Sequence, residues 1–340
     1  MNVLADYHHG GLYGSLKRLF EDRLGWNLYR PIETDWFTEG WWKVAEPYGN
    51  PQETINQYLD THNRSWGGFP NLNQDYKLED NVYHIYDPEN QIYHKAISFK
   101  VFKEMRFDLI VASHPLHASW IDLLKYQPKA KFIMQIGNEG QTATAKNIMS
   151  SVSQFQPQSG QNVFFYHQEF PTDHLGWEEP KNHNIITSFV HLLPHPEIYY
   201  QYKNLLEEFN FRSYGMQCPD GIPPSKEELG MKMKESAFGW HIKPADGYGH
   251  LIHQWYACGR PVITKGSYYE GKTGGMLLTD QETCIDLDKH SIKENCDLIR
   301  FWSQPENHTK MCLNAKKRFH YVVDFDAEAK QFKDWISLIV

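Results

Sequence analysis

The segment that most constrains the fold covers residues 240–263 and reads WHIKPADGYGHLIHQWYACGRPVI. Its pattern predicts a strand, a tight glycine turn, one amphipathic helix and a second strand opened by Gly-Arg-Pro. Gly247 and Gly249 leave backbone N–H groups uncovered where the helix begins, and the helix dipole adds partial positive charge there. The order strand, glycine turn, helix therefore predicts an anion-binding site in an α/β protein.

The same segment resembles the C-terminal domain of glycosyltransferases of the GT-B fold, especially the retaining ones, which carry E-x-F-G-L-x-x-x-E-A-M-A-x-G-x-P-V-I. The spacing is intact, but Asp246 and Gln254 stand where the family has glutamates. The resemblance implies that Asp246 contacts the donor sugar, that Gln254 holds the ribose and that the turn between them binds the diphosphate. An amide can form hydrogen bonds here but cannot act as an anion. The residues of the turn are Gly247, Tyr248, Gly249 and His250.

Strand and helix signals alternate along both halves of the 340-residue chain. They predict parallel sheets covered by helices, and the length suits two domains of about 150 residues each. We expect the fold class α/β, with two Rossmann-like domains that face a cleft in the GT-B arrangement. The expected domains are residues 1–193 on the acceptor side, with an insertion over 31–80, residues 194–325, which bind the nucleotide sugar, and residues 326–340, a terminal helix that crosses the domain junction.

Four elements of this prediction can be checked directly. A helix is expected over residues 142–152 and a strand over 185–190, both in the first domain. A helix is expected over 226–235 and a strand over 276–278, both in the second domain.

Two histidines and a glycine pair follow the first expected strand: His8, His9, Gly10 and Gly11. Glycines let the backbone approach a ligand closely, and histidine can move protons near neutral pH. The resemblance implies that this loop faces the donor diphosphate and the acceptor, with a histidine that is the base in many inverting members. The alternative is a tight turn that carries two solvated histidines.

A second histidine pair, His114 and His117, follows the strand expected over residues 107–112. The resemblance implies that a histidine at this strand end touches the donor sugar, and the choice between the two stays open. The alternative is that one of them caps the next helix, since loops at strand ends collect polar residues.

Residues 266–273 satisfy the P-loop pattern G-x-x-x-x-G-K-[ST]. A P-loop has to open a helix, however, and the two glycines and apolar residues that follow are more typical of a strand. Family members follow their P-V-I with a glycine loop, a glutamate and T-G-L-L-V. The resemblance therefore implies that Glu270 binds the donor.

Positive charge for a departing nucleoside diphosphate has several candidate sources. Lys243 lies three residues before Asp246, at the expected strand end. The Arg and Lys pair that the family places earlier is missing near residues 185–200, so Lys243, Lys265 and Lys272 are the candidate substitutes. Each of the three could equally be a solvated surface lysine.

Composition argues against several other classes of protein. A net charge of −8 gives no global basic field for nucleic acid, and no apolar run approaches the roughly 20 residues that span a bilayer. Five scattered cysteines without a C-x-x-C pair suggest neither a disulfide framework nor a zinc site. The D-x-D pairs at 286–288 and 324–326 fall late in the chain, so we predict no metal and no cofactor. No leader features precede the first strand, which predicts a cytoplasmic enzyme.

These observations predict a metal-independent glycosyltransferase of the hexosyltransferase type that moves a sugar from a nucleotide sugar, such as a UDP-sugar, to an acceptor hydroxyl. The resemblance favours retention of configuration. The acceptor stays open among a glycan, a small molecule and a hydroxymethylated base in phage DNA, since residues 6–31 resemble viral glycosyltransferases. Two alternatives remain: a GT-B-fold sugar-nucleotide epimerase, and a non-catalytic sugar-nucleotide binding protein, which the two replaced acids suggest.

Overall fold

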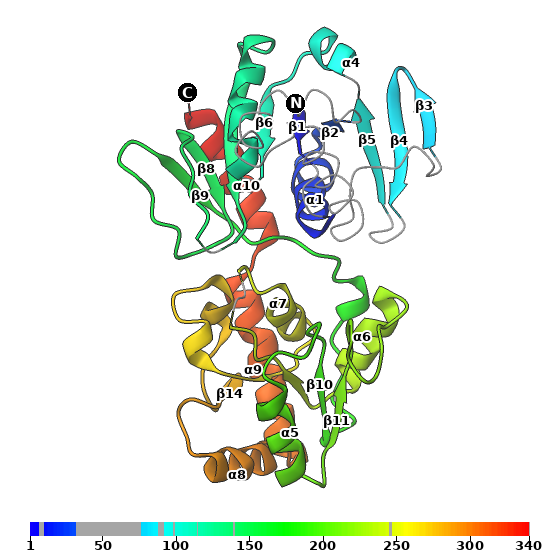
Figure 1. Ribbon diagram of the computed structural model, residues 1–340, viewed down its shortest axis with the longest axis vertical. Coiled ribbons are helices and arrows are strands. Elements are labelled where there is room, and N and C mark those ends of the chain that lie inside the picture. Colours follow the sequence, from blue (N-terminus) through cyan, green and yellow to red (C-terminus); the bar gives the residue numbers. More distant parts are fainter. Residues whose placement is uncertain are drawn as a thin grey trace, which may run out of the picture. The chain divides into compact units, whose positions relative to one another are not determined.

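The computed structural model describes residues 1–6, 10–31, 76–87, 92–97, 99–113, 115–138, 140–244 and 247–339. They form two compact units, each built on a sheet of its own (Figure 1). The first unit comprises Met1–Phe170 and Phe325–Val340, and the second comprises Pro171–Asp324. The chain therefore leaves the first unit once and returns to it with its last helix.

A nine-stranded sheet forms the centre of the first unit, in the order β3-β4-β5-β2-β1-β6-β7-β8-β9. Neighbours from β5 to β9 are parallel, whereas β3, β4 and β5 form antiparallel hairpins. The strands are β1 (Asn2–Ala5), β2 (Asn27–Pro31), β3 (Tyr76–Glu79), β4 (Val82–Asp87), β5 (Ile92–Ile97), β6 (Leu109–Ala112), β7 (Lys131–Ile136), β8 (Asn147–Ser150) and β9 (Asn162–Phe165). The β3–β4 turn is Asp80-Asn81, and both residues have positive φ, as tight two-residue hairpins require.

Helices cover the first unit's sheet. α1 (Gly10–Lys17) continues into a π-helical segment, η1 (Arg18–Arg23), and α4 (Phe99–Glu104) and the 3₁₀ helix η3 (Pro115–Lys125) flank β6. The last helix, α10 (Phe325–Leu338), completes the unit, and Figure 1 shows it beside β8 and β9.

The side chains of these strands alternate between two apolar cores, as the twofold period of a strand requires. Val3 and Ala5 belong to the core that also holds Phe332 and Ile336 of α10. Leu4, between them, belongs to the other core. The sheet is thus buried on both faces, which is typical of parallel sheets.

The second unit has a five-stranded, fully parallel sheet in the order β11-β10-β12-β13-β14. Its strands are β10 (Ile185–Ser188), β11 (Asn210–Ser213), β12 (Phe238–Trp240), β13 (Val262–Thr264) and β14 (Cys284–Asp286). Its α-helices are α5 (Pro196–Leu205), α6 (Lys226–Glu235), α7 (His250–Ala257), α8 (Ile292–Trp302) and α9 (Pro305–Val322). Short 3₁₀ segments are η4 (Asp173–Leu175), η5 (Gly266–Tyr268) and η6 (Thr273–Leu277).

Local sequence explains where several of these helices begin. The Ser225 hydroxyl accepts the backbone N–H of Glu228 and starts α6, and Ser291 forms a capping box with Glu294 at α8. Proline occupies the first turn of α5 and α9, where its missing N–H costs nothing.

Three expectations need correction. Residues 142–152, predicted as a helix, contain strand β8 instead, and the strand predicted over 276–278 overlaps the last two residues of the 3₁₀ helix η6. The strand predicted over 185–190 is present as β10 but pairs with β11 and β12, so it lies in the second sheet. The two units accordingly divide at Phe170, earlier in the chain than residue 193. All four residues of β8 are buried, including the polar Asn147 and Ser150, so the strand shows no alternation of apolar and polar residues that would distinguish it from a helix.

The length and polarity of a helix decide whether it could cross a membrane. None of the helices within the described ranges is both long and apolar enough to cross a bilayer.

Candidate functional site

The glycine turn before α7 lies at the carboxyl end of β12. The chain leaves β12 at Trp240, and Gly249 is the N-cap residue of α7. Gly249 has φ 82°, a left-handed conformation that strains any residue with a Cβ. Since glycine has no side chain, the N-cap places no group over the start of the helix. The partial positive charge of the helix dipole thus lies at a strand end where α/β sheets bind ligands.

Aromatic contacts hold this turn against its own helix. The Tyr248 ring stacks on the His253 ring, with 4.3 Å between centroids and 13° between planes. Nδ1–H of His253 donates to the carbonyl oxygen of Gly249 at 2.9 Å. Tyr248 also meets the His250 ring edge-on, at 4.8 Å between centroids. Tyr248 and His253 are buried, so the packing of these two rings preorganises the turn.

The segment after β13 is tied to the segment that joins β12 to α7. The Tyr269 hydroxyl donates to the carbonyl oxygen of Lys243 at 3.4 Å, and Nζ of Lys272 donates to the carbonyl oxygen of Pro244 at 3.4 Å. Lys272 Nζ also lies 5.8 Å from the centre of the Tyr269 ring. Glu270 is exposed between these two anchors. The structure therefore brings the Glu270 segment next to Lys243.

This arrangement also decides the P-loop question. Residues 273–277 form the short 3₁₀ helix η6, and no α-helix begins at Thr273 in this described stretch. Lys272 is buried and directed at Pro244. A P-loop lysine would instead reach phosphates held at the start of an α-helix.

Gln254 lies on α7, one helical turn after His250, so both side chains lie on one face of the helix. Its side chain is half-buried, and its carboxamide makes no hydrogen bond with the described residues. An amide in this state can still donate to and accept from a ligand hydroxyl.

Lys265 and the D-x-D pair at 286–288 belong to the scaffold. Lys265 Nζ lies 2.6 Å from the Asp288 carboxylate, and this hydrogen bond raises the pKa of the lysine. Asp288 also accepts the backbone N–H of Ser267, and Asp286 accepts that of Gly266 at 2.7 Å. These contacts join the ends of β13 and β14. Lys265 is thus a weaker source of charge for a ligand than its position in the sequence suggested.

In the first unit, a buried carboxylate joins the two strands that lead to the predicted histidines. Asp6 follows β1, and its Oδ1 accepts the backbone N–H of Ser113, after β6, at 2.7 Å. The Ser113 hydroxyl donates to the same carboxylate at 2.6 Å. β1 and β6 are parallel neighbours, so the segments that follow them start side by side. Neither residue was predicted from the sequence, although an aspartate directly after a buried strand is a usable signal.

The other predicted residues of this region are placed as follows. Gly10 and Gly11 open α1, and His117 lies in η3. His8, His9, His114 and Asp246 lie outside the described residues.

Arg260 is a third residue whose role was not predicted from the sequence. Its guanidinium is fully buried and donates to the carbonyl oxygens of Lys234 at 2.7 Å and Glu178 at 3.1 Å. It also lies 5.7 Å from the centre of the Trp177 ring. The Gly-Arg-Pro signature before β13 therefore fixes the end of α6 and the segment near Trp177 at the amino edge of the second sheet, opposite the edge that carries the glycine turn.

No protein-family model and no curated protein matches the sequence. Solved structures, in contrast, match along nearly the whole chain. The catalytic domain of starch synthase IV from Arabidopsis thaliana has a TM-score of 0.58 at 9% identity, covering 99% of this chain and 98% of that one. The fold is GT-B.

Two further GT-B structures agree with this assignment. A glycosyltransferase from Rickettsia africae has a TM-score of 0.57 at 11% identity, covering 99% of this chain and 97% of that one. TarM from S. aureus has a TM-score of 0.56 at 8% identity, covering 98% and 99%. Identities of this size establish the GT-B architecture and leave the chemistry to be argued from the residues.

Proposed function

We propose that this protein is a glycosyltransferase that moves a sugar from a nucleoside-diphosphate sugar to an acceptor hydroxyl. The observation that carries the proposal is the left-handed Gly249 at the start of α7, at the carboxyl end of β12 of a GT-B fold. A helix start in this position attracts an anion, and the diphosphate is the anionic part of such a donor.

The residues around the turn receive roles in this proposal. Gly247, Tyr248, Gly249 and His250 hold the diphosphate, and the carboxamide of Gln254 binds the ribose. Charge that develops on the leaving diphosphate is stabilised by nearby cations. Lys243 is the first of these, because its backbone is fixed by Tyr269. Lys272 is buried, donates to the carbonyl oxygen of Pro244 before the turn, and adds positive potential there.

Sugar recognition and proton transfer are assigned from the sequence resemblance. Asp246 and Glu270 bind the donor sugar, and Gly10 and Gly11 lie near the diphosphate. A histidine among His8, His9, His114 and His117 moves the acceptor proton. The Asp6–Ser113 contact supports this group, since it joins the strands that precede these histidines. The reaction proposed is a metal-independent hexosyl transfer with retention of configuration.

The nucleotide is best sought among nucleoside diphosphates. The TarM structure contains UDP, and the structure of starch synthase IV contains ADP. We propose a UDP-sugar as the first donor to test. A GDP-sugar and an ADP-sugar are the next two.

Thermal unfolding of the full chain with UDP, ADP, GDP and ATP with magnesium tests the donor site. A ligand at a hundred times its dissociation constant adds about 2.7 kcal/mol of stability, which shifts the midpoint clearly. One nucleoside diphosphate should stabilise the protein selectively. Stabilisation by ATP with magnesium alone would contradict the proposal.

A matched pair of variants locates the binding. Gln254→Ala should weaken the preferred diphosphate about tenfold, because it removes the proposed ribose contact. Gln201→Ala, at an exposed position of α5, should leave the affinity unchanged. Equal affinities in the two variants would remove Gln254 from the site.

Turnover then separates an enzyme from a binding protein. Nucleotide sugar plus acceptor should release the diphosphate, and Asp246→Asn should abolish this release while leaving diphosphate binding intact. An isomerised donor formed without acceptor would indicate an epimerase. Tight donor binding without turnover for any acceptor would indicate a non-catalytic protein.

A further inference from the structure

The first unit has a pocket of about 470 Å³ at β7 and β8. Its walls come from the connection between β7 and β8 and from the connection between β8 and β9. Parallel strands are usually joined through a helix that covers the sheet. Neither connection forms a helix in its described residues. Loops therefore cover this part of the sheet, and the pocket lies where a helix would otherwise pack.

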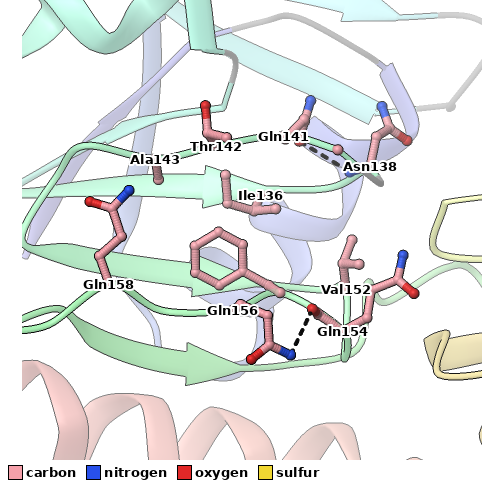
Figure 2. Close-up of a pocket in the computed structure, with 11 residues that line it drawn as sticks. Ile136, Asn138, Gln141, Thr142, Ala143, Val152, Gln154, Gln156 and Gln158 are labelled. Carbon is pink, nitrogen blue, oxygen red and sulfur yellow. Dashed lines mark hydrogen bonds between the residues drawn. The ribbon is translucent and has the colours of Figure 1, made fainter.

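The lining of the pocket combines amides with an apolar floor. The apolar residues are Ile136, Ala143, Val152 and Phe155, and the side-chain amides are Asn138, Gln141, Gln154, Gln156 and Gln158. Figure 2 shows the labelled amides contributed by both connections. The described residues that line the pocket include no ionisable side chain.

Two of these side-chain amides form hydrogen bonds within the protein. Oε1 of Gln141 accepts the backbone N–H groups of Gly137 and Asn138, at 2.9 and 3.1 Å. Nε2 of Gln156 donates to the carbonyl oxygen of Gln154 at 3.3 Å, drawn as a dashed line in Figure 2. These bonds fix the two loops on either side of the pocket. They leave Nε2 of Gln141 and Oε1 of Gln156 for another partner.

Three further polar side chains on the rim keep all of their hydrogen-bonding groups available for a ligand. Within the described part of the chain, the side chains of Asn138, Thr142 and Gln158 make no hydrogen bond to the protein. Each carboxamide offers both a donor and an acceptor, and the hydroxyl offers the same pair. A ligand with many hydroxyls and no charge matches this set, because every hydroxyl also donates and accepts.

We infer that this pocket is a binding site for an uncharged saccharide, separate from the residues proposed to hold the donor. Its volume falls within the range of roughly 300–1,000 Å³ typical of small-ligand pockets. The apolar floor suits the C–H faces of a sugar ring, and the amides suit its hydroxyls. An anionic ligand would find no opposite charge among the described lining residues.

Saccharide binding can be measured without any nucleotide. Titration of the full chain with maltose and with N,N′-diacetylchitobiose, followed by calorimetry or ligand-detected NMR, should show saturable millimolar binding of at least one of them. Glucuronic acid and glucose 6-phosphate should bind more weakly than glucose. Absence of saturation with every neutral sugar, or tighter binding of the charged ones, would overturn the inference.

Variants place the binding in the pocket. The double variant Asn138→Ala with Gln158→Ala should weaken the neutral sugar about tenfold, the loss expected for two uncharged hydrogen bonds. Thr142→Trp should block the rim and abolish binding. Gln331→Ala, at an exposed position of α10 in the same unit, should bind as the unaltered protein does.

Equal affinity in the double variant and in Gln331→Ala would overturn the assignment of the pocket. This outcome is distinct from a failure of the proposed function, because UDP binding and maltose binding are read separately. A protein that binds UDP but no neutral sugar would retain the transferase proposal and lose this one.

Discussion

At the scale of single residues, Arg260 carries the clearest expectation about stability. Its guanidinium has no solvent exposure and donates to carbonyl oxygens of Lys234, Glu178 and Cys258. Arg260→Ala would leave several of these buried acceptors without a donor. We expect the free energy of unfolding to fall by about 3 kcal/mol in urea denaturation.

Arg318→Ala is the matched control for this prediction. Arg318 also lies in the second unit and donates to one carbonyl oxygen, that of Met276, at 2.9 Å in an exposed setting. Its loss should cost about 0.5 kcal/mol. Similar losses in the two variants would show that burial of Arg260 is not what makes it important.

His308 is the residue that should make stability depend on pH. Burial lowers its pKa to about 4, and the nearby His183 and Arg260 act in the same direction. Nε2–H of His308 donates to the carbonyl oxygen of Ala237 at 2.8 Å, so its Nδ1 accepts from Nδ1 of His183 at 2.9 Å. A proton added to Nδ1 of His308 would therefore face another N–H group.

The direction in which pH changes the stability follows from the pKa of His308 in the unfolded and in the folded chain. The unfolded chain binds this proton near its ordinary pKa of 6.5, whereas the folded chain binds it only near 4. The free energy of unfolding should fall as pH drops from about 6.5 to about 4, by up to about 3 kcal/mol. Urea titrations at pH 7.5 and pH 4.5 measure this loss.

His308→Gln keeps a donor for the Ala237 carbonyl oxygen and cannot titrate. The variant should lose much less stability than the unaltered protein between the two pH values. An equal loss would assign the acid sensitivity to other groups.

At the scale of elements, the start of α7 is the feature to test. Ala at position 249 would have to adopt the φ of 82° that Gly249 has, at a cost of about 1–2 kcal/mol. Gly160 has a nearly identical φ of 83° in a loop of the first unit. Gly249→Ala and Gly160→Ala should therefore destabilise the protein similarly. Only Gly249→Ala should also weaken UDP, measured by calorimetry on the folded proteins.

Equal UDP affinity in the two glycine variants would show that the turn geometry does not matter for the anion. Loss of affinity in both would point to general destabilisation rather than to the turn.

Elements with strong local signals were predictable from sequence. The helix expected over 226–235 is confirmed as α6, because its Ser225 cap and its lysines and glutamates favour a helix locally. The strand-turn-helix order around the glycine turn is likewise confirmed by β12 and α7. The β3–β4–β5 hairpins were missed, since their pairing depends on partners rather than on composition.

The candidate site was predictable only in part, for the same reason. The glycine turn is local and could be read from Gly247 and Gly249. The contacts of Tyr269 with Lys243 and of Lys272 with Pro244 join segments more than twenty residues apart, and only the fold brings them together. The buried hydrogen-bond partners of Arg260 and His308 also lie far away in the sequence, so only the fold reveals them.

At the scale of the whole molecule, α10 should contribute to the stability of the first unit and not to that of the second. Phe332 is fully buried there and packs on Phe20 and Phe164. Phe332→Ala should cost about 3–5 kcal/mol. Hydrogen exchange should quicken in β7 and β8 but not in β12 or β13, because the second unit has a core of its own.

Phe301→Ala is the control, since Phe301 is 53% exposed and lies in the second unit. It should leave exchange in both sheets unchanged. Faster exchange in β12 of the Phe332→Ala protein would show that the two units unfold together.

The return of the chain to its first unit has a consequence for the order of synthesis. The second unit is one continuous segment, Pro171–Asp324, and can fold as soon as it has left the ribosome. The first unit is begun earlier but lacks Phe332 and Ile336 until the segment after residue 324 has been made. Translation proceeds at roughly 5–20 residues per second, so one apolar face of this sheet stays uncovered by α10 for on the order of ten seconds. Of the two units, the one begun first is therefore completed second, and it is the unit with the greater need of chaperones.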